Sequence, residues 1–152
     1  MSVEAALEAG LVGSWRLRSF ELRLGDGSVI HPYGEDVHGF LFYNEDGYMS
    51  AAFENARRTT SRSEDLAEAG AAVNYDQFMA YTGPYAVEGD RIQHQVEVSS
   101  LDVWTGTIQE RWFKVDGDVL MLLTAPLSVG SDAPTGYLIW DRARGIQGAS
   151  AG

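Results

Sequence analysis

Residues 81–123 read YTGPYAVEGDRIQHQVEVSSLDVWTGTIQERWFKVDGDVLMLL, and this alternation of apolar and polar side chains predicts three consecutive β-hairpins. We expect strands at 81–88, 91–98, 107–115 and 118–123. Gly89-Asp90 and Asp116-Gly117 should form the outer turns, and a loop around Asp102 should join the two middle strands. Glycine and aspartate suit two-residue hairpin turns because they tolerate a positive φ. The stretch therefore predicts four antiparallel strands that neighbour one another in a sheet.

Counting outward from each turn predicts which residues face each other. Tyr85 should lie opposite His94, His94 opposite Arg111, and Arg111 opposite Leu122. The same count pairs Tyr81 with Val98, Ile92 with Phe113, Val96 with Gln109, and Phe113 with Leu120. Opposed residues share a face of the sheet. One face is therefore apolar and carries Tyr81, Tyr85, Val87, Ile92, Val96, Val98, Phe113, Leu120 and Leu122. The other should meet water and carries Glu88, Arg91, Gln93, Gln95, Glu97, Glu110 and Lys114.

A row of three polar groups, Tyr85, His94 and Arg111, crosses the apolar face. A buried arginine is costly unless it pairs with a carboxylate or receives an anionic or carbonyl group, and no carboxylate is evident nearby on that face. The fixed charge of Arg111 disfavours a cationic neighbour, so His94 is expected to be neutral near pH 7. The row could hold a carbonyl or enolate oxygen at Arg111 while His94 moves a proton on the adjacent carbon and Tyr85 relays one.

The same residues also allow a plainer interpretation, in which His94, Arg111, Tyr85 and Gln109 form a satisfied polar network in the core. Candidate ligand-binding residues are Tyr81, Trp104, Tyr48, Ser50, Gln109, Leu122 and Phe113, although core packing explains each aromatic equally well. His31, His38 and His94 lack the spacing of a metal site, so no metal is predicted. The cations Arg57, Arg58 and Arg62 could guide an anionic substrate, or simply pair with Glu54, Glu64 and Asp65.

Bulk composition narrows the class of protein. A chain of 152 residues suits one domain, and a net charge of −11 argues against nucleic-acid and anionic-membrane partners. No apolar run approaches the roughly 18 residues of a membrane helix. The N-terminal residues lack the basic region of a secretory signal, and there is no cysteine, so we expect a cytoplasmic protein. Nucleotide-binding and serine-hydrolase motifs are missing, and we expect no cofactor. The sequence leaves a homodimer open.

The rest of the chain adds strands to the meander. Residues 3–9 should form a short helix that ends at Gly10, with Leu7 and Leu11 covering one end of the fold. A strand over 13–24 changes apolar phase after Leu17, which predicts a bulge. Further strands are expected at 29–31 and 136–142, and a fraying tail at 143–152. The capping box Ser61-Arg62-Ser63-Glu64 opens a helical insertion at about 61–80, which could plug or cover an opening.

A hairpin is expected over 38–53, around Glu45-Asp46-Gly47. We group Phe40, Phe42, Met49, Ala51 and Phe53 on one face and Leu41, Tyr43, Tyr48, Ser50 and Ala52 on the other. Periodicity does not say which face points inward. With this hairpin the chain has about nine strands in sequential antiparallel order. The prediction is an all-β, up-and-down closed barrel of about 8–10 strands, forming a single domain over 1–152.

Several motifs make the chain resemble the lipocalin-like domain family, the small intracellular calycin-type barrels of bacteria and fungi. They span 11–142 and comprise Gly13-Ser14-Trp15, Pro32-Tyr33-Gly34, Gly39-Phe40-Leu41-Phe42-Tyr43, Asp46-Gly47-Tyr48-Met49-Ser50-Ala51, Tyr81-Thr82-Gly83-Pro84-Tyr85, His94, Trp104-Thr105-Gly106, Arg111 and Trp140-Asp141-Arg142. The resemblance implies that Trp15 closes the barrel base under Arg142, a cation–π partner. It also implies natural-product metabolism, whereas the missing signal peptide and cysteines argue against transport between cells.

The leading functional hypothesis is a cofactor-independent enzyme that acts on a small, apolar, oxygenated molecule of polyketide or terpenoid type. Cyclisation, isomerisation, or addition and loss of water are the expected reaction classes, with His94, Arg111 and Tyr85 as catalytic residues. A non-catalytic carrier of the same kind of ligand is the main alternative. A structural module with a filled barrel is the third.

Overall fold

The structure, a computed structural model, describes residues 3–57, 77–125 and 134–145. Its elements in chain order are α1 (Val3–Glu8), β1 (Gly13–Arg23), β2 (Val29–Ile30), β3 (Val37–Tyr43), β4 (Tyr48–Asn55), β5 (Phe78–Glu88), β6 (Arg91–Gln95), β7 (Val98–Ser99), the 3-10 turn η1 (Asp102–Trp104), β8 (Ile108–Asp116), β9 (Val119–Thr124) and β10 (Thr135–Arg142). The capping box and most of the expected helical insertion lie outside the described residues. Residues 78–80 of that insertion are strand, not helix.

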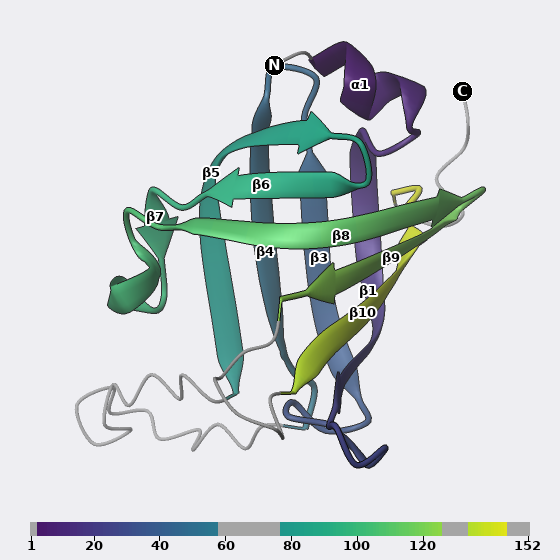
Figure 1. The fold of residues 1–152 in the computed structure, drawn as a ribbon, viewed down its shortest axis with the longest axis vertical. Helices are drawn as coiled ribbons and strands as arrows, with labels where there is room; N and C mark the ends of the chain where they lie inside the picture. Colours follow the sequence, from purple (N-terminus) through teal and green to yellow (C-terminus); the bar gives the residue numbers. More distant parts are fainter. Residues whose placement is uncertain (1–2, 58–76, 126–133, 146–152) are drawn as a thin grey trace.

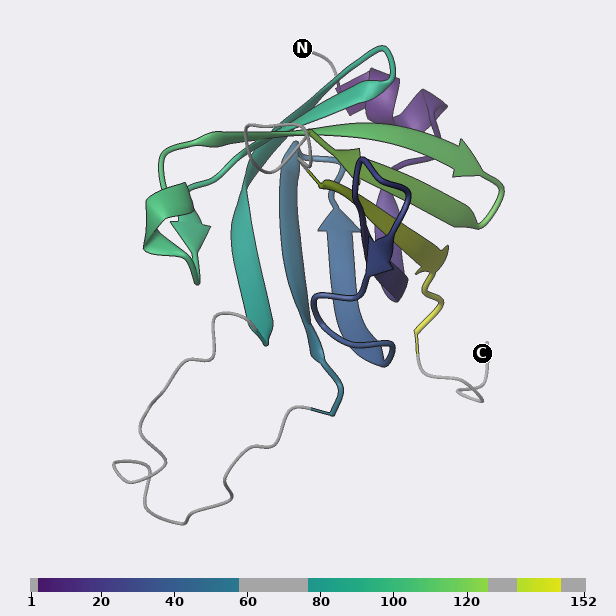
Figure 2. The same cartoon turned by 60° about the horizontal axis from the view of Figure 1, so that its bottom comes forward.

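The strands of the described part close into an antiparallel barrel (Figure 1). Eight of them follow the order β1-β3-β4-β5-β6-β8-β9-β10, and β10 pairs again with β1. Figure 2 shows this ring with the end opposite α1 turned forward. Short strands β2 and β7 pair with β1 and β5. The up-and-down barrel predicted from the sequence is thus confirmed, because closure gives every long strand two partners.

The first strand bends where its apolar residues change phase. Its pairing with β10 shifts register between Leu17 and Ser19, which is the predicted bulge. The bulge lets Trp15 and Leu17 point into the barrel before it and Phe20 and Leu22 line the interior after it. Strong local twist of this kind is what a closed barrel requires.

The register between β6, β8 and β9 differs by two residues from the prediction. His94 lies opposite Gln109, and Arg111 lies opposite Ile92 on one side and Thr124 on the other. The β8–β9 turn is Gly117-Asp118 instead of Asp116-Gly117, because Asp116 already pairs with Val119. A two-residue shift leaves each side chain on its face. His94 and Arg111 therefore both point inward, as the sequence predicts.

The strand expected over 91–98 breaks after Gln95. Gly83 on β5 lies so close to the crossing chain that a Cβ there would stand 1.8 Å from the carbonyl oxygen of Gln95. Beyond the crossing, Thr82 pairs with Val98 and Tyr81 with Ser99, a slip of one residue. The prediction that Val98 faces the core is wrong, because the slip turns its side chain outward, where it is 64% exposed.

The hairpin β3–β4 corrects the predicted grouping of faces. Tyr43 pairs with Met49 and Leu41 with Ala51, because three residues, Glu45-Asp46-Gly47, separate the hydrogen-bonded residues Asn44 and Tyr48, with Gly47 at φ 91°. An odd loop count places Leu41, Tyr43, Met49, Ala51 and Phe53 together on the buried face. Phe40, Phe42, Tyr48, Ser50 and Ala52 share the outer face.

The short helix lies over one end of the barrel (Figure 1). It ends before Gly10, at φ 74°, as predicted. Ala6 on the helix and Leu11 just after it are fully buried, whereas Leu7, expected to cover this end, is 48% exposed.

Candidate functional site

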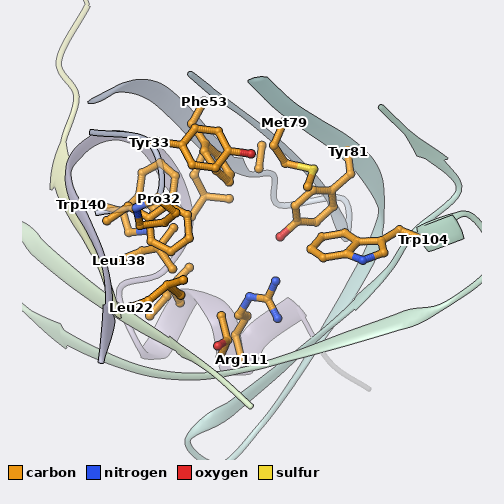
Figure 3. Close-up of a pocket in the computed structure, with 15 residues that line it drawn as sticks. Leu22, Pro32, Tyr33, Phe53, Met79, Tyr81, Trp104, Arg111, Leu138 and Trp140 are labelled. Carbon is orange, nitrogen blue, oxygen red and sulfur yellow. The ribbon is translucent and has the colours of Figure 1, made fainter. Parts of the chain in front are cut away.

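An apolar cavity of about 230 Å³ lies inside the barrel (Figure 3). Side chains from seven strands of the ring, from the loop after β2 and from η1 build its wall. The lining residues are Phe20, Leu22, Pro32, Tyr33, Leu41, Ala51, Phe53, Met79, Tyr81, Trp104, Arg111, Leu122, Thr124, Leu138 and Trp140. Inward-facing alternate residues of a closed barrel produce such a lining, and barrels of about eight strands have room for one small ligand.

One side of the cavity is polar and is formed by Arg111, Tyr81 and Trp104 (Figure 3). Arg111 is 7% exposed, and its Nη1 donates a 2.8 Å hydrogen bond to the carbonyl oxygen of Glu110. Its guanidinium carbon lies 5.9 Å from the Trp104 ring centre, and Trp104 meets Tyr81 edge to face at 5.5 Å. No carboxylate within the described ranges lies at ion-pair distance from Arg111. Donor groups of this cation are thus available to a ligand.

His94 lies behind this polar side and is fully buried. Its Nδ1 is 2.9 Å from the hydroxyl of Tyr81, and its Nε2 is 2.6 Å from the hydroxyl of Tyr43. It is not among the residues that line the cavity, whereas its hydrogen-bond partner Tyr81 is. A ligand in the cavity would meet the hydroxyl of Tyr81, and His94 would act on it through that hydroxyl.

The titratable groups of this cluster are all neutral near pH 7. Burial, and secondarily the charge of Arg111, holds the pKa of His94 well below its usual value, which confirms the predicted neutral imidazole. Burial raises the pKa of Tyr43 well above 10. Burial also raises the pKa of Tyr81, although the charge and hydrogen bonding of Arg111 oppose that rise. The neutral cluster beside one fixed cation favours hydrogen bonding to a ligand oxygen.

Tyr85 takes a different place from the one predicted. Its backbone pairs with His94 as expected, but its hydroxyl donates a 2.8 Å hydrogen bond to the carbonyl oxygen of Asn44. Its ring meets that of Tyr43 edge to face at 4.8 Å. The polar row is therefore His94 with Tyr43 and Tyr81, because these two hydroxyls, and not that of Tyr85, reach the imidazole.

Tyr43 is the member of this cluster that sequence reasoning missed. The signal was present in the loop length, since three residues between Asn44 and Tyr48 put Tyr43 and Met49 on one face. The same loop length overturns the prediction that Tyr48 and Ser50 line the cavity. Both lie on the outer face of β4, and Tyr48 is 52% exposed.

The remaining predicted site residues divide between the cavity and its surroundings. Tyr81, Trp104, Leu122 and Arg111 line the cavity. Gln109 instead lines a neighbouring surface groove that also contains Trp104 and Arg111, and its amide donates to Thr107 Oγ1 at 2.8 Å. Phe113 packs against the core without reaching the cavity wall.

Trp140 lines the cavity and carries a buried indole N–H. It is 1% exposed, and its indole N–H has no hydrogen-bond partner among the described residues. Buried polar groups without a partner are uncommon in folded proteins. In Figure 3 the Trp140 ring lies across the cavity from Trp104 and Tyr81.

Among the described residues, His31, His38 and Arg57 do not line the cavity. Within the described residues, no three of the side chains His, Asp and Glu come together as a metal site would require. Arg57 pairs with Asp36. Arg58 and Arg62, with Glu64 and Asp65, lie outside the described residues.

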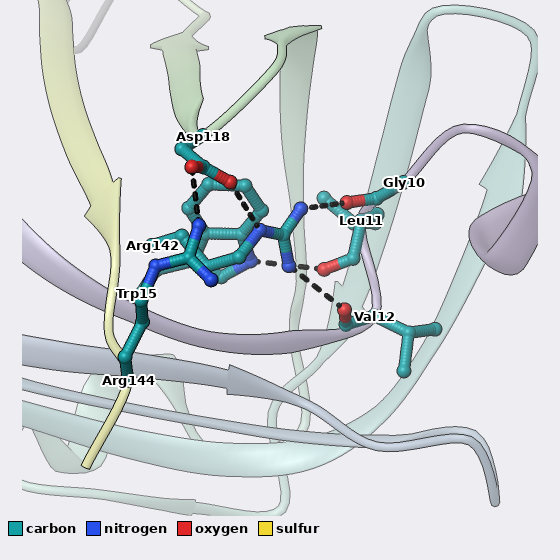
Figure 4. A network of polar contacts seen from close by, with 7 residues as sticks. All are labelled: Gly10, Leu11, Val12, Trp15, Asp118, Arg142 and Arg144. Atoms are coloured by element: carbon teal, nitrogen blue, oxygen red, sulfur yellow. Dashed lines mark hydrogen bonds and ion pairs between the residues drawn. The ribbon is translucent and has the colours of Figure 1, made fainter.

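The other end of the barrel is held by Trp15 and Arg142 (Figure 4). Trp15 is fully buried, and its indole nitrogen donates to the carbonyl oxygen of Leu11 at 2.9 Å. The guanidinium of Arg142 lies 4.2 Å from the centre of the Trp15 ring and donates to the carbonyl oxygens of Gly10 and Val12. Asp118 pairs with the same guanidinium. This is the stacked pair expected from the family resemblance.

A profile of the lipocalin-like domain family matches residues 12–143 of the sequence. The chain belongs to the lipocalin-like domain family. The matched range runs from just before β1 to just after β10 and so includes the complete ring of strands. The resemblance drawn from the motifs is thereby confirmed, and with it the fold of this lipocalin-like protein.

One curated relative is the 4'-hydroxy-3'-methoxypropiophenone carrier protein ppsC of Aspergillus oryzae. It is 35% identical over 78 residues, which cover 45% of this chain and 70% of the relative. Among solved structures, a lipocalin-like protein from Bacteroides uniformis is 15% identical with a TM-score of 0.47, covering 88% of this chain and 98% of that one. An uncharacterized protein from Bacteroides eggerthii is 14% identical with a TM-score of 0.43, over 86% and 98%.

The described helical residues contain no stretch with the length and apolar character needed to cross a membrane.

Proposed function

We propose that this lipocalin-like protein binds a small aromatic or otherwise apolar molecule that carries a carbonyl oxygen, and holds it inside the barrel. The observation that carries the proposal is the apolar cavity with one polar side, where Arg111 has no carboxylate partner within the described residues and Tyr81 stands beside it. Ligand sites are commonly apolar pockets with a few polar groups that fix orientation.

The size of the cavity supports a ligand with about one ring. An engineered apolar cavity of roughly 150 Å³ holds benzene, and pockets for drug-sized ligands begin near about 300 Å³. A cavity of about 230 Å³ falls between these sizes. The ligand named for the relative from Aspergillus oryzae is a one-ring ketone, which suits this volume and the donors at Arg111 and Tyr81. A role as a carrier in natural-product metabolism follows as part of the proposal.

Isothermal titration with 4'-hydroxy-3'-methoxypropiophenone tests the proposal. We expect saturable binding at one site and a negative heat-capacity change, as apolar burial requires. Two neighbouring alanines on β4 supply matched variants, because Ala51 lines the cavity and Ala52 faces outward. Ala51→Leu should fill the cavity and abolish binding, whereas Ala52→Leu should leave it unchanged. Equal binding by both variants would place the ligand outside the barrel and contradict the proposal.

A second candidate function is the cofactor-independent enzyme, and the hydrogen bond between Tyr81 and His94 is the observation that favours it. Tyr81 would deliver its hydroxyl proton to the ligand oxygen, and Nδ1 of His94 would return a proton to the Tyr81 hydroxyl. Cyclisation, isomerisation and hydration or dehydration all use such a step. Arg111 would stabilise the negative charge that develops on the oxygen.

Product analysis separates the two candidates. Recovery of bound ligand unchanged after long incubation favours the carrier, and a new product that disappears with Tyr81→Phe favours the enzyme. Full turnover by a correctly folded His94→Gln protein would remove His94 from the mechanism. A cytoplasmic location and a homodimer remain predictions from the sequence.

A further inference from the structure

The hydroxyls of Tyr43 and Tyr81 contact the two ring nitrogens of His94 from opposite sides, at 2.6 Å and 2.9 Å. A neutral imidazole carries one N–H and one bare nitrogen, so one tyrosine must donate to the ring and the other must accept from it. The choice between these two arrangements decides what the hydroxyl of Tyr81 offers to the cavity.

Tyr43 fixes the choice. It is 1% exposed, does not line the cavity, and its hydroxyl has His94 Nε2 as its one hydrogen-bond partner among the described residues. If it accepted a proton from Nε2, its own hydroxyl hydrogen would be buried without a partner, which costs the full desolvation of that group. If it donates to Nε2, the hydroxyl hydrogen of Tyr43 has a partner.

The tautomer of His94 in turn determines the direction of its hydrogen bond with Tyr81. With Nε2 bare, the proton of His94 is on Nδ1 and is donated to the hydroxyl oxygen of Tyr81. That oxygen also lies beside the guanidinium of Arg111, which can only donate. The hydrogen of the Tyr81 hydroxyl is then directed away from both donors and is free for a ligand in the cavity.

We propose that Tyr43 locks His94 as the Nδ1–H tautomer, so that Tyr81 and Arg111 together present two hydrogen-bond donors to one acceptor oxygen of the ligand. Tyr43 and His94 act as positioning residues, and Tyr81 and Arg111 are the groups that touch the ligand. The site thereby selects a ketone, or another ligand with an acceptor oxygen and no competing donor at that position. This inference rests on the proposed function and names the chemical class that the site accepts.

The tautomer is tested directly by imidazole ¹⁵N NMR, which needs no ligand. The chain has three histidines, and His31 and His38 are both exposed, so the double variant H31Q/H38Q leaves His94 as the single histidine without disturbing the core. We expect a protonated, pyrrole-type signal for Nδ1 and a bare, pyridine-type signal for Nε2. The reverse assignment would make Tyr81 donate to His94 and would overturn the proposal.

The donor pair is tested with two ligands that differ by one oxygen, propiophenone and propylbenzene. Loss of one hydrogen bond corresponds to roughly three- to tenfold in affinity. Tyr81→Phe should therefore weaken propiophenone by about fivefold and leave propylbenzene within about twofold. Equal affinity of the wild-type protein for the two ligands would overturn the donor pair while the binding function stands. Failure of both to bind would contradict the binding function and this inference together, whatever the NMR tautomer.

Discussion

His94 is a buried imidazole, and both the stability of the fold and the hydrogen bonding of the site depend on its neutral form. Tyr43 on β3, Tyr81 and Tyr85 on β5, and Arg111 on β8 are the titratable or charged groups around it. The tyrosine pKa values are all raised, so none of these neighbours changes charge between pH 5 and 8. Any acid-linked change in this cluster must come from the imidazole itself.

This gives a signed prediction for stability against pH. The pKa of His94 is depressed in the folded protein, whereas an unfolded chain has a histidine pKa of about 6.5. Below that value the unfolded state binds a proton that the folded state does not, so stability is fully present above pH 6.5 and falls as the pH is lowered. Between pH 7.5 and 5.5 the loss assigned to His94 should be about 1 kcal/mol. Urea unfolding should show that extra loss in the wild type relative to His94→Gln, and equal losses would contradict it.

Trp140 allows a test of ligand position at the same scale. Its indole N–H has no partner among the described residues, whereas that of Trp15 is bonded to the Leu11 carbonyl. In ¹H–¹⁵N spectra, 4'-hydroxy-3'-methoxypropiophenone should shift the Trp140 indole signal and leave the Trp15 signal in place. A shift of Trp15 without one of Trp140 would put the ligand at the wrong end of the barrel.

The side chains around His94 also show what the sequence can predict about the site. The inward direction of His94 and Arg111, and the neutral imidazole, followed from strand alternation and charge. The pairing of hydroxyls could not follow in the same way, because it depends on which tyrosine rings reach the imidazole. Tyr85 is the cross-strand neighbour of His94, yet its hydroxyl bonds to Asn44, and Tyr43 arrives from a strand 51 residues earlier.

Among the elements, β5 and β6 decide where the polar side of the cavity lies. Because Gly83 has no side chain, the backbone at Gln95 can approach the β5 backbone closely. Strand β6 ends at this close approach, and β7 then pairs with β5. The turn η1 follows and brings Trp104 to the cavity wall beside Tyr81. The one-residue slip arises at this crossing, and alternation alone could not locate it. The bulge in β1, by contrast, can be predicted from the change in apolar alternation along that strand.

A methyl group at Gly83 tests this crossing. Its Cβ would stand 1.8 Å from the Gln95 carbonyl oxygen, so Gly83→Ala must push two backbone segments apart. Overpacking typically costs about 1–3 kcal/mol, and we expect a loss of at least ~2 kcal/mol in the urea unfolding free energy. Ala86→Ser on the outer face of β5 is the control and should change stability by less than about 0.5 kcal/mol. An equally stable Gly83→Ala protein would show that the close approach is not there.

The pairing of β1 with β10 closes the strand meander into a barrel and so defines the fold of the described part of the chain. The sequence predicts this closure well, because turn residues and alternation are local signals and a closed barrel leaves no long strand unpaired. The cavity was less predictable, since its volume depends on how far aromatic side chains from opposite walls reach. The expected capping box at 61–64 lies outside the described residues.

We expect the side chain of Arg142 to stabilise the closed barrel. It stacks on Trp15 and donates to carbonyls of Gly10 and Val12, with 22% of its side chain exposed. Arg142→Ala should lower the unfolding free energy by roughly 2–3 kcal/mol, because charge-assisted hydrogen bonds and a cation–π contact are lost together. Arg144 pairs with the same Asp118 but is 61% exposed, so Arg144→Ala should cost less than about 1 kcal/mol. Similar losses in the two variants would refute a special role for Arg142.

The most direct test of the account is a crystal structure of the protein with propiophenone bound. We predict that the aromatic ring lies inside the barrel, against Phe53 and Leu138, and that the carbonyl oxygen lies within hydrogen-bond distance of both the Tyr81 hydroxyl and the Arg111 guanidinium. A barrel interior without ligand at saturating concentration, or a ketone oxygen turned away from Tyr81 and Arg111, would contradict it.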